Sequence, residues 1–315
     1  MTLGWLAVRG VDWGLVAEEF NSFPVKWAVA SLAVMMLSTV VRAYRWQRLF
    51  LEEKPHLPRM FLVQNTGIGL NSLVPLRVAG EGAQFALLTL RYGVRRGVAL
   101  GTMGVERVLD LVVTASLLMA GLTLIPDKGD VLPYVVGAFV VAVASVIAIP
   151  FLVYLSAKPF LRRIPLIVST AGYLTDLGKA KFAITSALFL TLGYWLLVGV
   201  CGWLLAVGMG LDISAFVATV AILGAIYFTT SLPGLPASLG TFEFAVVYVL
   251  KLFGVAQAAS FSYAVGLHAI LFLPPILIAV AMLLTLGVKS MVSGSGPQMQ
   301  RSEPAAVKDT GRIGV

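Results

Sequence analysis

Two stretches of the sequence place a carboxylate beside proline and glycine within otherwise apolar surroundings. The first covers residues 71–81 (NSLVPLRVAGE), and the second covers residues 231–243 (SLPGLPASLGTFE). Proline removes a backbone donor and glycine permits sharp turns, so both stretches predict interrupted helices with unpaired backbone groups. Matching interruptions in two halves of a membrane chain indicate a transporter binding site, and an inverted pseudo-repeat could relate them.

The first stretch carries Arg77 and Glu81 four residues apart, with Asn71 before them and Pro75 and Gly80 as the interruptions. Arginine is a permanently charged, planar donor that suits phosphate or carboxylate. We therefore expect a lipid-headgroup site in which Arg77 holds the anion. The alternative is an interfacial loop whose arginine reaches water. The second interrupted stretch favours the headgroup site.

Three further charges, Glu106, Arg107 and Asp110, lie inside an apolar segment at 97–125. Charges at such a depth cost several kcal/mol unless they are paired or hydrated, which makes them functional candidates. Arg107 and Asp110 are three residues apart and are expected to pair along the helix. Glu106 then needs another cation, for which Arg77 is the candidate. A structural ion network, or Glu106 as a proton carrier, are the open alternatives.

The second stretch contains Pro233, Pro236 and Gly240, followed by Glu243 in the first turn of a new apolar helix. The prolines leave carbonyl groups unpaired, and Gly240 permits a turn into that helix. Glu243 could belong to a substrate site. It could equally cap the helix, because the helix dipole favours an anion in the first turn.

The whole chain has the composition of a membrane protein. Of its 315 residues, 59% are hydrophobic and 12% are charged, whereas soluble domains carry roughly 25% charged residues. One span needs about 20 apolar residues. The sequence therefore predicts an all-α polytopic membrane protein with about seven transmembrane helices, plus a re-entrant segment at 58–76 entering from the cytoplasmic side. The expected spans are 26–50, 97–125, 131–155, 182–209, 213–232, 241–254 and 259–288.

Charge and composition divide the chain into three parts. Residues 1–25 are expected to form an interfacial helix, 26–290 the membrane domain, and 291–315 a disordered polar tail. Clusters of lysine and arginine indicate the cytoplasmic (inner) membrane, with the N-terminus outside and the C-terminus cytoplasmic. Arg42, Arg45, Trp46 and Arg48 are expected to form an interfacial belt; recruitment of anionic headgroups there is the alternative.

Several classes of function lack support. The net charge of +8 has no nucleic-acid-binding motif with it, so an anionic membrane surface explains it better. One cysteine and two histidines give no basis for a metal site. His268 lies in an apolar segment, where packing is favoured over a role as relay or ligand. No phosphate-binding or dinucleotide fingerprint occurs, so no cofactor is expected.

Four motifs together resemble the flippase-like membrane domain of lysylphosphatidylglycerol synthases. They are Arg45-Trp46, Gly67…Asn71…Pro75…Gly80-Glu81, Glu106-Arg107…Asp110 and Pro233…Gly240…Glu243. The resemblance implies a lipid-handling bundle whose polar core contains Arg77, Glu81, Glu106, Arg107, Asp110 and Glu243. The soluble aminoacyl-transferring domain of those synthases has no counterpart in the sequence, so synthase activity is not expected. Stand-alone relatives suggest glycolipid, polyprenyl-lipid or hopanoid pathways.

Three hypotheses follow. The first is a flippase or transporter that moves an anionic or lipid-linked substrate, with membrane lipids as its partners. The second is an integral membrane enzyme in which Glu81, Glu106 or Glu243 is a general base; it lacks a recognised nucleophile or metal set and is less favoured. The third is a non-catalytic membrane partner of a lipid-biosynthesis enzyme.

Overall fold

The computed structural model of the chain describes residues 13–52, 54–74, 78–125, 131–231 and 236–292. The predictions made for Pro75, Arg77, Pro233 and the tail from 293 onward lie outside these residues. Within the described residues the protein is helical and contains no strand. This confirms the prediction of an all-α protein.

Five helices are long and apolar enough to cross a membrane, which confirms a polytopic membrane protein. They are α3 (Val25–Leu49), α6 (Arg96–Gly121), α7 (Leu132–Ser156), α9 (Lys181–Gly208) and α12 (Gln257–Val292). The expected spans at 213–232 and 241–254 are two shorter helices, α10 (Ala215–Ser231) and α11 (Thr241–Leu252). At about 1.5 Å per residue neither covers the ~30 Å hydrocarbon core alone.

The remaining elements are short. They are α2 (Trp13–Ser22), α4 (Leu57–Leu73), α5 (Ala79–Ala86) and α8 (Pro165–Lys179), with the π-helical η1 (Leu87–Arg91) and the 3₁₀ turns η2 (Leu122–Leu124), η3 (Leu161–Arg163) and η4 (Pro236–Ser238). Proline at the first turn suits the starts of α4, α7 and α8, because the missing amide hydrogen has no partner there anyway.

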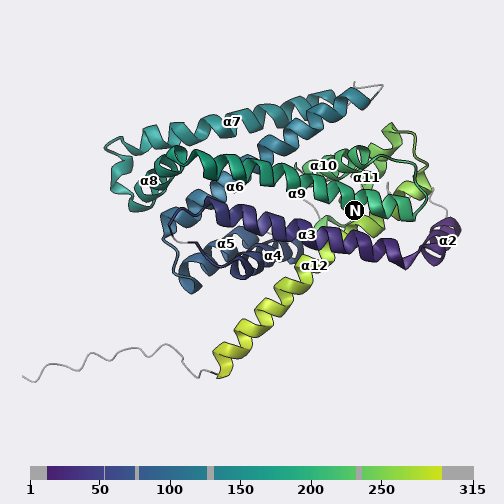
Figure 1. The fold of residues 1–315 in the computed structure, drawn as a ribbon, viewed down its shortest axis with the longest axis horizontal. Coiled ribbons are helices and arrows are strands. Elements are labelled where there is room, and N and C mark those ends of the chain that lie inside the picture. Colours follow the sequence, from purple (N-terminus) through teal and green to yellow (C-terminus); the bar gives the residue numbers. More distant parts are fainter. Residues whose placement is uncertain (1–12, 53, 75–77, 126–130, 232–235, 293–315) are drawn as a thin grey trace, which may run out of the picture.

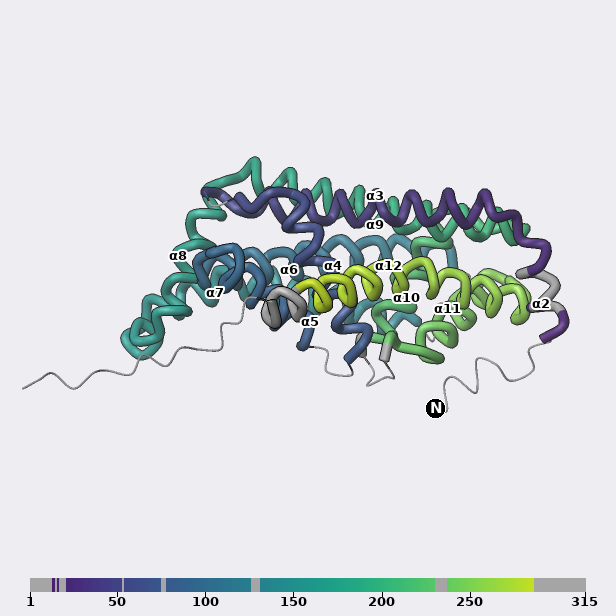
Figure 2. Tube along the Cα trace, turned by 90° about the horizontal axis from the view of Figure 1, so that it is seen from below, coloured from purple at the N-terminus to yellow at the C-terminus, as the bar shows by residue number. Residues whose placement is uncertain are grey.

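The long helices α3 and α9 run antiparallel and side by side (Figures 1 and 2). Near one end, the Ser31 hydroxyl donates to the Cys201 carbonyl at 2.7 Å. Near the other, the Arg48 guanidinium lies 5.2 Å from the centre of the Phe182 ring. Each of these helices begins one half of the protein. The halves, α3–α6 and α9–α12, both run long helix, short helix, short helix, long helix.

In each half the two short helices form a hairpin. Arg59 at the start of α4 lies 5.4 Å from the Tyr92 ring just after η1, so α4 and α5 leave and return on one side. In the other half, Phe228 of α10 and Phe244 of α11 have ring centres 5.9 Å apart. Since α9 has crossed the bundle before α10 begins, the second hairpin enters from the opposite side. This arrangement agrees with the predicted inverted pseudo-repeat and the re-entrant first hairpin.

The two halves are interlocked. α4 packs on α12 of the other half, and α10 packs on α6. Gly69 of α4 lies so close to α12 that a Cβ atom there would overlap the Pro275 carbonyl oxygen. Small residues allow such close helix contacts in membranes. In Figure 2, α4, α12 and α10 form a layer beneath α3 and α9.

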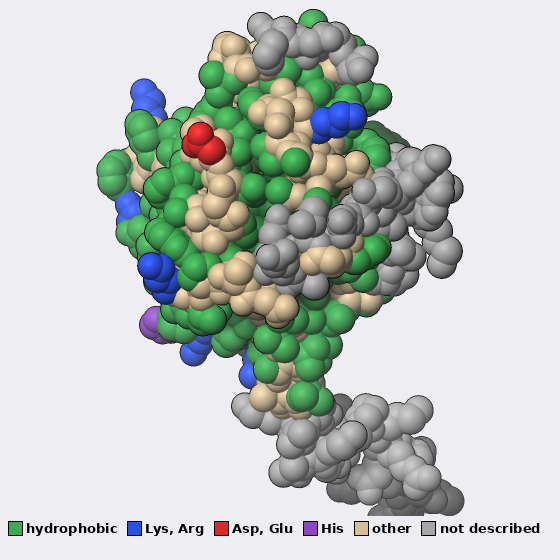
Figure 3. Space-filling view, turned by 90° about the vertical axis from the view of Figure 1, so that its right-hand side faces the viewer, with side chains coloured by type: hydrophobic (Ala, Val, Ile, Leu, Met, Phe, Trp, Pro, Cys, Tyr) green, Lys and Arg blue, Asp and Glu red, His purple; other side chains and the backbone are tan. Residues whose placement is uncertain are grey.

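The outside of the bundle is apolar. Almost all of α7 is unburied, Ala142 being its only buried residue, and its exposed side chains include Phe139, Val140 and Ile147. Figure 3 shows hydrophobic side chains and backbone over most of one face, with few charged groups. Such a surface is suited to lipid.

The short helix α8 is attached to the end of α3. The Tyr173 hydroxyl donates a hydrogen bond to the Leu49 carbonyl at 2.7 Å. Burial raises the pKa of Tyr173, so this hydroxyl remains a donor at neutral pH. Nearby, Arg95 pairs with Glu52 at 3.1 Å. The ends of α3, η1 and α8 are therefore gathered on one side of the protein.

Candidate functional site

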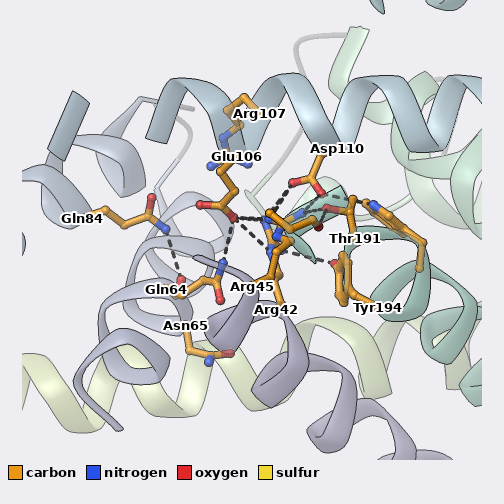
Figure 4. A network of polar contacts seen from close by, with 12 residues as sticks. Arg42, Arg45, Gln64, Asn65, Gln84, Glu106, Arg107, Asp110, Thr191 and Tyr194 are labelled. Carbon is orange, nitrogen blue, oxygen red and sulfur yellow. Dashed lines mark hydrogen bonds and ion pairs between the residues drawn. The ribbon is translucent and has the colours of Figure 1, made fainter. Parts of the chain in front are cut away.

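A buried group of charges joins α3 to α6 (Figure 4). Arg45, whose side chain is fully buried, donates from Nη2 to Glu106 Oε1 at 2.6 Å and pairs through Nη1 with Asp110. Arg42 lies 3.4 Å from Glu106 and 3.7 Å from Asp110. Two guanidinium groups thus face two carboxylates. We call these four residues the neutral cluster, because their formal charges cancel.

Polar side chains from other helices extend the hydrogen bonding of the neutral cluster, in which the buried Nε atoms of Arg42 and Arg45 have no hydrogen-bond partner among the described residues. Gln64 of α4 donates to Glu106 at 2.8 Å. From α9, Trp195 donates to Asp110 at 3.2 Å, and Thr191 accepts from Arg45 at 3.2 Å. The Tyr194 ring centre lies 5.2 Å from the Arg42 guanidinium. Pairing and cation–π contact together offset the cost of burying these charges.

Three predictions about these residues are wrong. Arg42, Arg45 and Trp46 do not form an interfacial belt, because Arg45 and Trp46 are completely buried and Arg42 is nearly so. Glu106 takes Arg45 and Arg42 as its cations, so it does not need Arg77. Asp110 pairs with the same two arginines and not with Arg107.

The reason lies in helix geometry. Glu106 and Asp110 are four residues apart and share one face of α6, which is turned toward α3. Arg107 follows Glu106 by one position, about 100° further round the helix. Arg42 and Arg45 are three apart on α3 and present a matching face. The three-residue spacing of Arg42 and Arg45 is the one sign in the sequence that they share a helix face. It does not show which residues they pair with, because that depends on the packing of α3 on α6.

A second polar group lies beside the first interruption. Glu81 of α5 accepts from Arg107 at 3.0 Å and from Asn71 at 3.0 Å. The Asn71 side chain also accepts from the Gly80 amide at 2.7 Å, which fixes the start of α5 against the end of α4. The Glu81 and Arg107 side chains are 36% and 44% exposed. Guanidinium donors of Arg107 are therefore accessible to a ligand. We call Asn71, Glu81 and Arg107 the accessible group.

The third group is a buried pair. Glu243 of α11 accepts from His268 Nδ1 of α12, or donates to it, at 2.6 Å. Its other oxygen accepts from the Gly240 amide at 2.7 Å. The capping role predicted as an alternative for Glu243 is confirmed. His268 packs against Phe242 and Phe272, with ring centres 5.2 and 4.4 Å away, yet packing alone does not describe it.

The turn before Glu243 is strained. Ala237 and Ser238 have φ angles of 55° and 59°, which side chains other than glycine rarely adopt. Gly240 follows with φ 79°, where the absence of a Cβ atom removes the penalty. This turn, which contains Pro236, contacts α4. The described tip of the second hairpin therefore contacts the first hairpin through α4.

The predicted site residues thus fall into three places. The neutral cluster holds Glu106 and Asp110, the accessible group holds Asn71, Glu81 and Arg107, and Glu243 lies apart with His268. No hydrogen bond or ion pair joins Glu243 to the first two groups among the described residues. Sequence reasoning missed that Arg42, Arg45 and Gln64 contact Glu106, and that His268 contacts Glu243. In the same part of the chain no three histidine, cysteine or acidic side chains lie together as metal ligands.

The comparisons with known proteins agree with this architecture. A family model described as "Lysylphosphatidylglycerol synthase TM region" matches residues 1–279, which include all three polar groups. None of the curated proteins compared with the chain matches it.

Proposed function

The chain belongs to the family of the lysylphosphatidylglycerol synthase TM region, and from this premise we propose that it moves an anionic or lipid-linked substrate between membrane leaflets. Membership of this family makes it a membrane protein of lipid metabolism or transport. Flipping is the finer step that we propose. The observation that carries it is the contact between two hairpins that enter from opposite sides, together with an accessible arginine beside the first of them.

Each polar group has a distinct part in this proposal. Arg107 binds the headgroup anion, while Glu81 and Asn71 hold the arginine and the start of α5. Arg77, which lies outside the described residues, stays a predicted second cation. The acyl chains stay in lipid along the apolar outer surface. The neutral cluster positions α3, α4, α6 and α9 and does not bind the headgroup, because its charges are already satisfied by one another.

The moving part is best sought in the short helices. In transporters built from repeats, one half commonly rocks against the other. The interlocked packing of α4 on α12 and α10 on α6 opposes such rocking. The strained turn at Ala237 and Ser238 instead favours movement of the hairpin tips.

We place the protein in the cytoplasmic (inner) membrane with the C-terminus inside. Arg45 is buried and Arg42 is nearly so, and they therefore do not count toward the excess of basic residues at a membrane surface. The side of the protein where α3 and η1 end still carries an excess of basic residues. They are Arg91, Arg95, Arg96 and the lysines and arginines near α8. The excess of basic residues therefore still indicates the cytoplasmic face.

The enzyme hypothesis has less support. A general base needs a carboxylate oxygen free to take a proton. Glu106 accepts from Arg45 and Gln64 and lies against Arg42, while Glu81 and Glu243 are each held by a cationic or titratable partner and by a second donor. These carboxylates are better suited to balancing charge.

The test uses purified protein in vesicles that contain a fluorescent anionic phospholipid in both leaflets. Dithionite bleaches the outer leaflet, so continued loss of fluorescence reports translocation. We expect Arg107→Ala to reduce the rate at least tenfold relative to wild type, because the accessible cation is lost.

Arg95→Ala is the matched control, since Arg95 also pairs with a glutamate on the surface but lies far from the hairpin tips. Its rate should equal that of wild type. Equal rates for Arg107→Ala and wild type would reject the headgroup site. Chemically altered lipid, detected by mass spectrometry of the same vesicles, would favour the enzyme hypothesis instead.

A further inference from the structure

The Glu81–Arg107 and Glu243–His268 pairs occupy equivalent positions in the two halves. Glu81 is the third residue of α5, and Glu243 is the third residue of α11. Arg107 is the twelfth residue of α6, and His268 is the twelfth residue of α12. In both halves, the carboxylate just after the interruption therefore reaches the same place on the following long helix. The contacts are 3.0 Å and 2.6 Å.

The two pairs differ in chemistry. Arginine keeps its charge at every accessible pH. Histidine is the side chain that ordinarily gains or loses its charge between about pH 5 and 8. The arginine pair is 36–44% exposed, whereas the side chains of the histidine pair are only 9–10% exposed. One half thus has a permanently charged pair that is open to solvent. The other half has a pair with a titratable histidine that is nearly shielded from solvent.

We propose that Glu243 and His268 form a proton-binding site that controls the second hairpin. When a proton from water binds the His268 ring, the imidazolium and the Glu243 carboxylate form an ion pair that holds α11 against α12. When the proton leaves, the carboxylate keeps its charge but loses its cation. A nearly buried carboxylate without a cation is costly, and contact with water lowers its free energy. The start of α11 therefore loosens to admit water.

The hydrogen bond from Gly240 connects this site to the hairpin tip. The Gly240 amide donates to Glu243, and Ala237 and Ser238 in left-handed conformations come just before it. Any displacement of the Glu243 side chain therefore removes a bond that holds the strained turn. In this way one proton can set the position of the segment that meets α4. The link to lipid movement rests on the proposed function; the proton site itself does not.

Other titratable groups lie on the helices that surround this pair. None of them forms a hydrogen bond or ion pair with Glu243 or His268 among the described side chains. Lys251 lies two turns further along α11 and is exposed. The rest are Tyr227 of α10 with Thr114, Arg59 of α4 with Tyr92, Arg42 and Arg45 of α3 and Tyr194 of α9 in the neutral cluster, Cys201 of α9 with Ser31, and the buried Tyr263 of α12.

The first measurement leaves the site unaltered. The chain has two histidines, so His56→Gln leaves His268 as the only one. Protein of this variant with ¹⁵N-labelled histidine is placed in lipid nanodiscs, and ring nitrogen shifts are followed from about pH 4.5 to 8.5. We expect one reversible change from charged to neutral ring, displaced in Glu243→Gln. A ring that keeps one charge state throughout would overturn the proposal.

The second measurement tests control of the hairpin by hydrogen exchange of residues 240–252, corrected for the intrinsic effect of pH. In wild type we expect protection to fall at least tenfold as the ring loses its proton. His268→Arg copies the permanently charged pair of the other half. In this variant, residues 240–252 should stay protected at every pH, provided that gel filtration shows a folded protein. The same pH response in His268→Arg and wild type would overturn the proposal.

These results are independent of lipid translocation. A titrating ring with a responding hairpin in a protein that moves no lipid would reject the proposed function and leave the proton site in place. A translocating protein whose His268 ring never titrates would do the reverse.

Discussion

Arg45 shows how a charged residue can be stable at depth in this protein. Its guanidinium is fully buried, yet it bonds to Glu106, Asp110 and Thr191. Arginine suits this position because its flat group donates in several directions at once. A lysine would offer a single point charge and could not reach both carboxylates in the same way. The residue therefore organises the meeting of α3, α6 and α9.

Removing that guanidinium is expected to be costly. Arg45→Ala leaves Glu106 and Asp110 with Arg42 as the only remaining arginine of the neutral cluster, so an uncompensated negative charge stays buried. Loss of one partner from a buried ion pair typically costs about 3–5 kcal/mol. We expect a marked fall in the melting temperature of the detergent-solubilised protein, followed by tryptophan fluorescence.

The control for this prediction is again Arg95→Ala. Arg95 and Glu52 are 60% and 80% exposed, and exposed pairs contribute only about 0–1 kcal/mol. Its melting temperature should stay close to that of wild type. If Arg45→Ala melted together with Arg95→Ala, the neutral cluster would not have the structural role assigned to it.

At the scale of elements, the interrupted segments were predictable and their partners were not. Proline, glycine and an acidic residue in series identified both hairpin tips, because these residue types act locally on the backbone. The pairing of Glu106 with Arg45 depends on which helix lies opposite α6, and residue spacing within α6 carries no such information. Arg42 and Arg45 were assigned to an interface because they lie near the end of an apolar segment. The later elements α4, α6 and α9 bury that end.

The contact between α4 and α12 offers a test at this scale. Gly69→Ala adds a methyl group where the Pro275 carbonyl and the Ala279 side chain leave no room. Pushing the helices apart should cost about 1–3 kcal/mol. The fall in melting temperature is the measurement.

Gly104→Ala is its counterpart within α6, where nothing lies within 4 Å of an added Cβ atom. Alanine is a better helix former than glycine by about 1 kcal/mol, so this variant should melt at the same temperature as wild type or higher. Similar behaviour of the two variants would contradict the close packing of the first hairpin on the second half.

At the scale of the whole molecule, the antiparallel contact of α3 and α9 joins the two halves. The Ser31 hydroxyl and the Cys201 sulfur are 3.2 Å apart. Cys201 is the only cysteine of the chain. We therefore expect Ser31→Cys to form a disulfide with Cys201 under mild oxidation, detected as a mass loss of two hydrogens in the intact protein.

Leu32→Cys is the control, because Leu32 is 41% exposed on another face of α3 and should not be cross-linked to Cys201. The cross-linked Ser31→Cys protein also distinguishes two kinds of motion. Translocation that continues at the wild-type rate would agree with movement of the hairpin tips. Translocation that stops on oxidation and returns on reduction would restore the rocking of one half against the other.

The neutral cluster also constrains how the protein is made. Arg42 and Arg45 leave the ribosome 61 to 68 residues before the carboxylates that neutralise them, and the Thr191, Tyr194 and Trp195 side chains follow much later still. A lone arginine costs at most about 2.5–3.5 kcal/mol on insertion scales, the value for the centre of a membrane helix, and Arg42 and Arg45 lie in the last third of α3. Newly inserted α3 should therefore wait at the translocon or at the membrane surface until α6 arrives. Biogenesis of this protein then has a fixed order, in which the first span is stably inserted in the bilayer only after the later helices that pair with it.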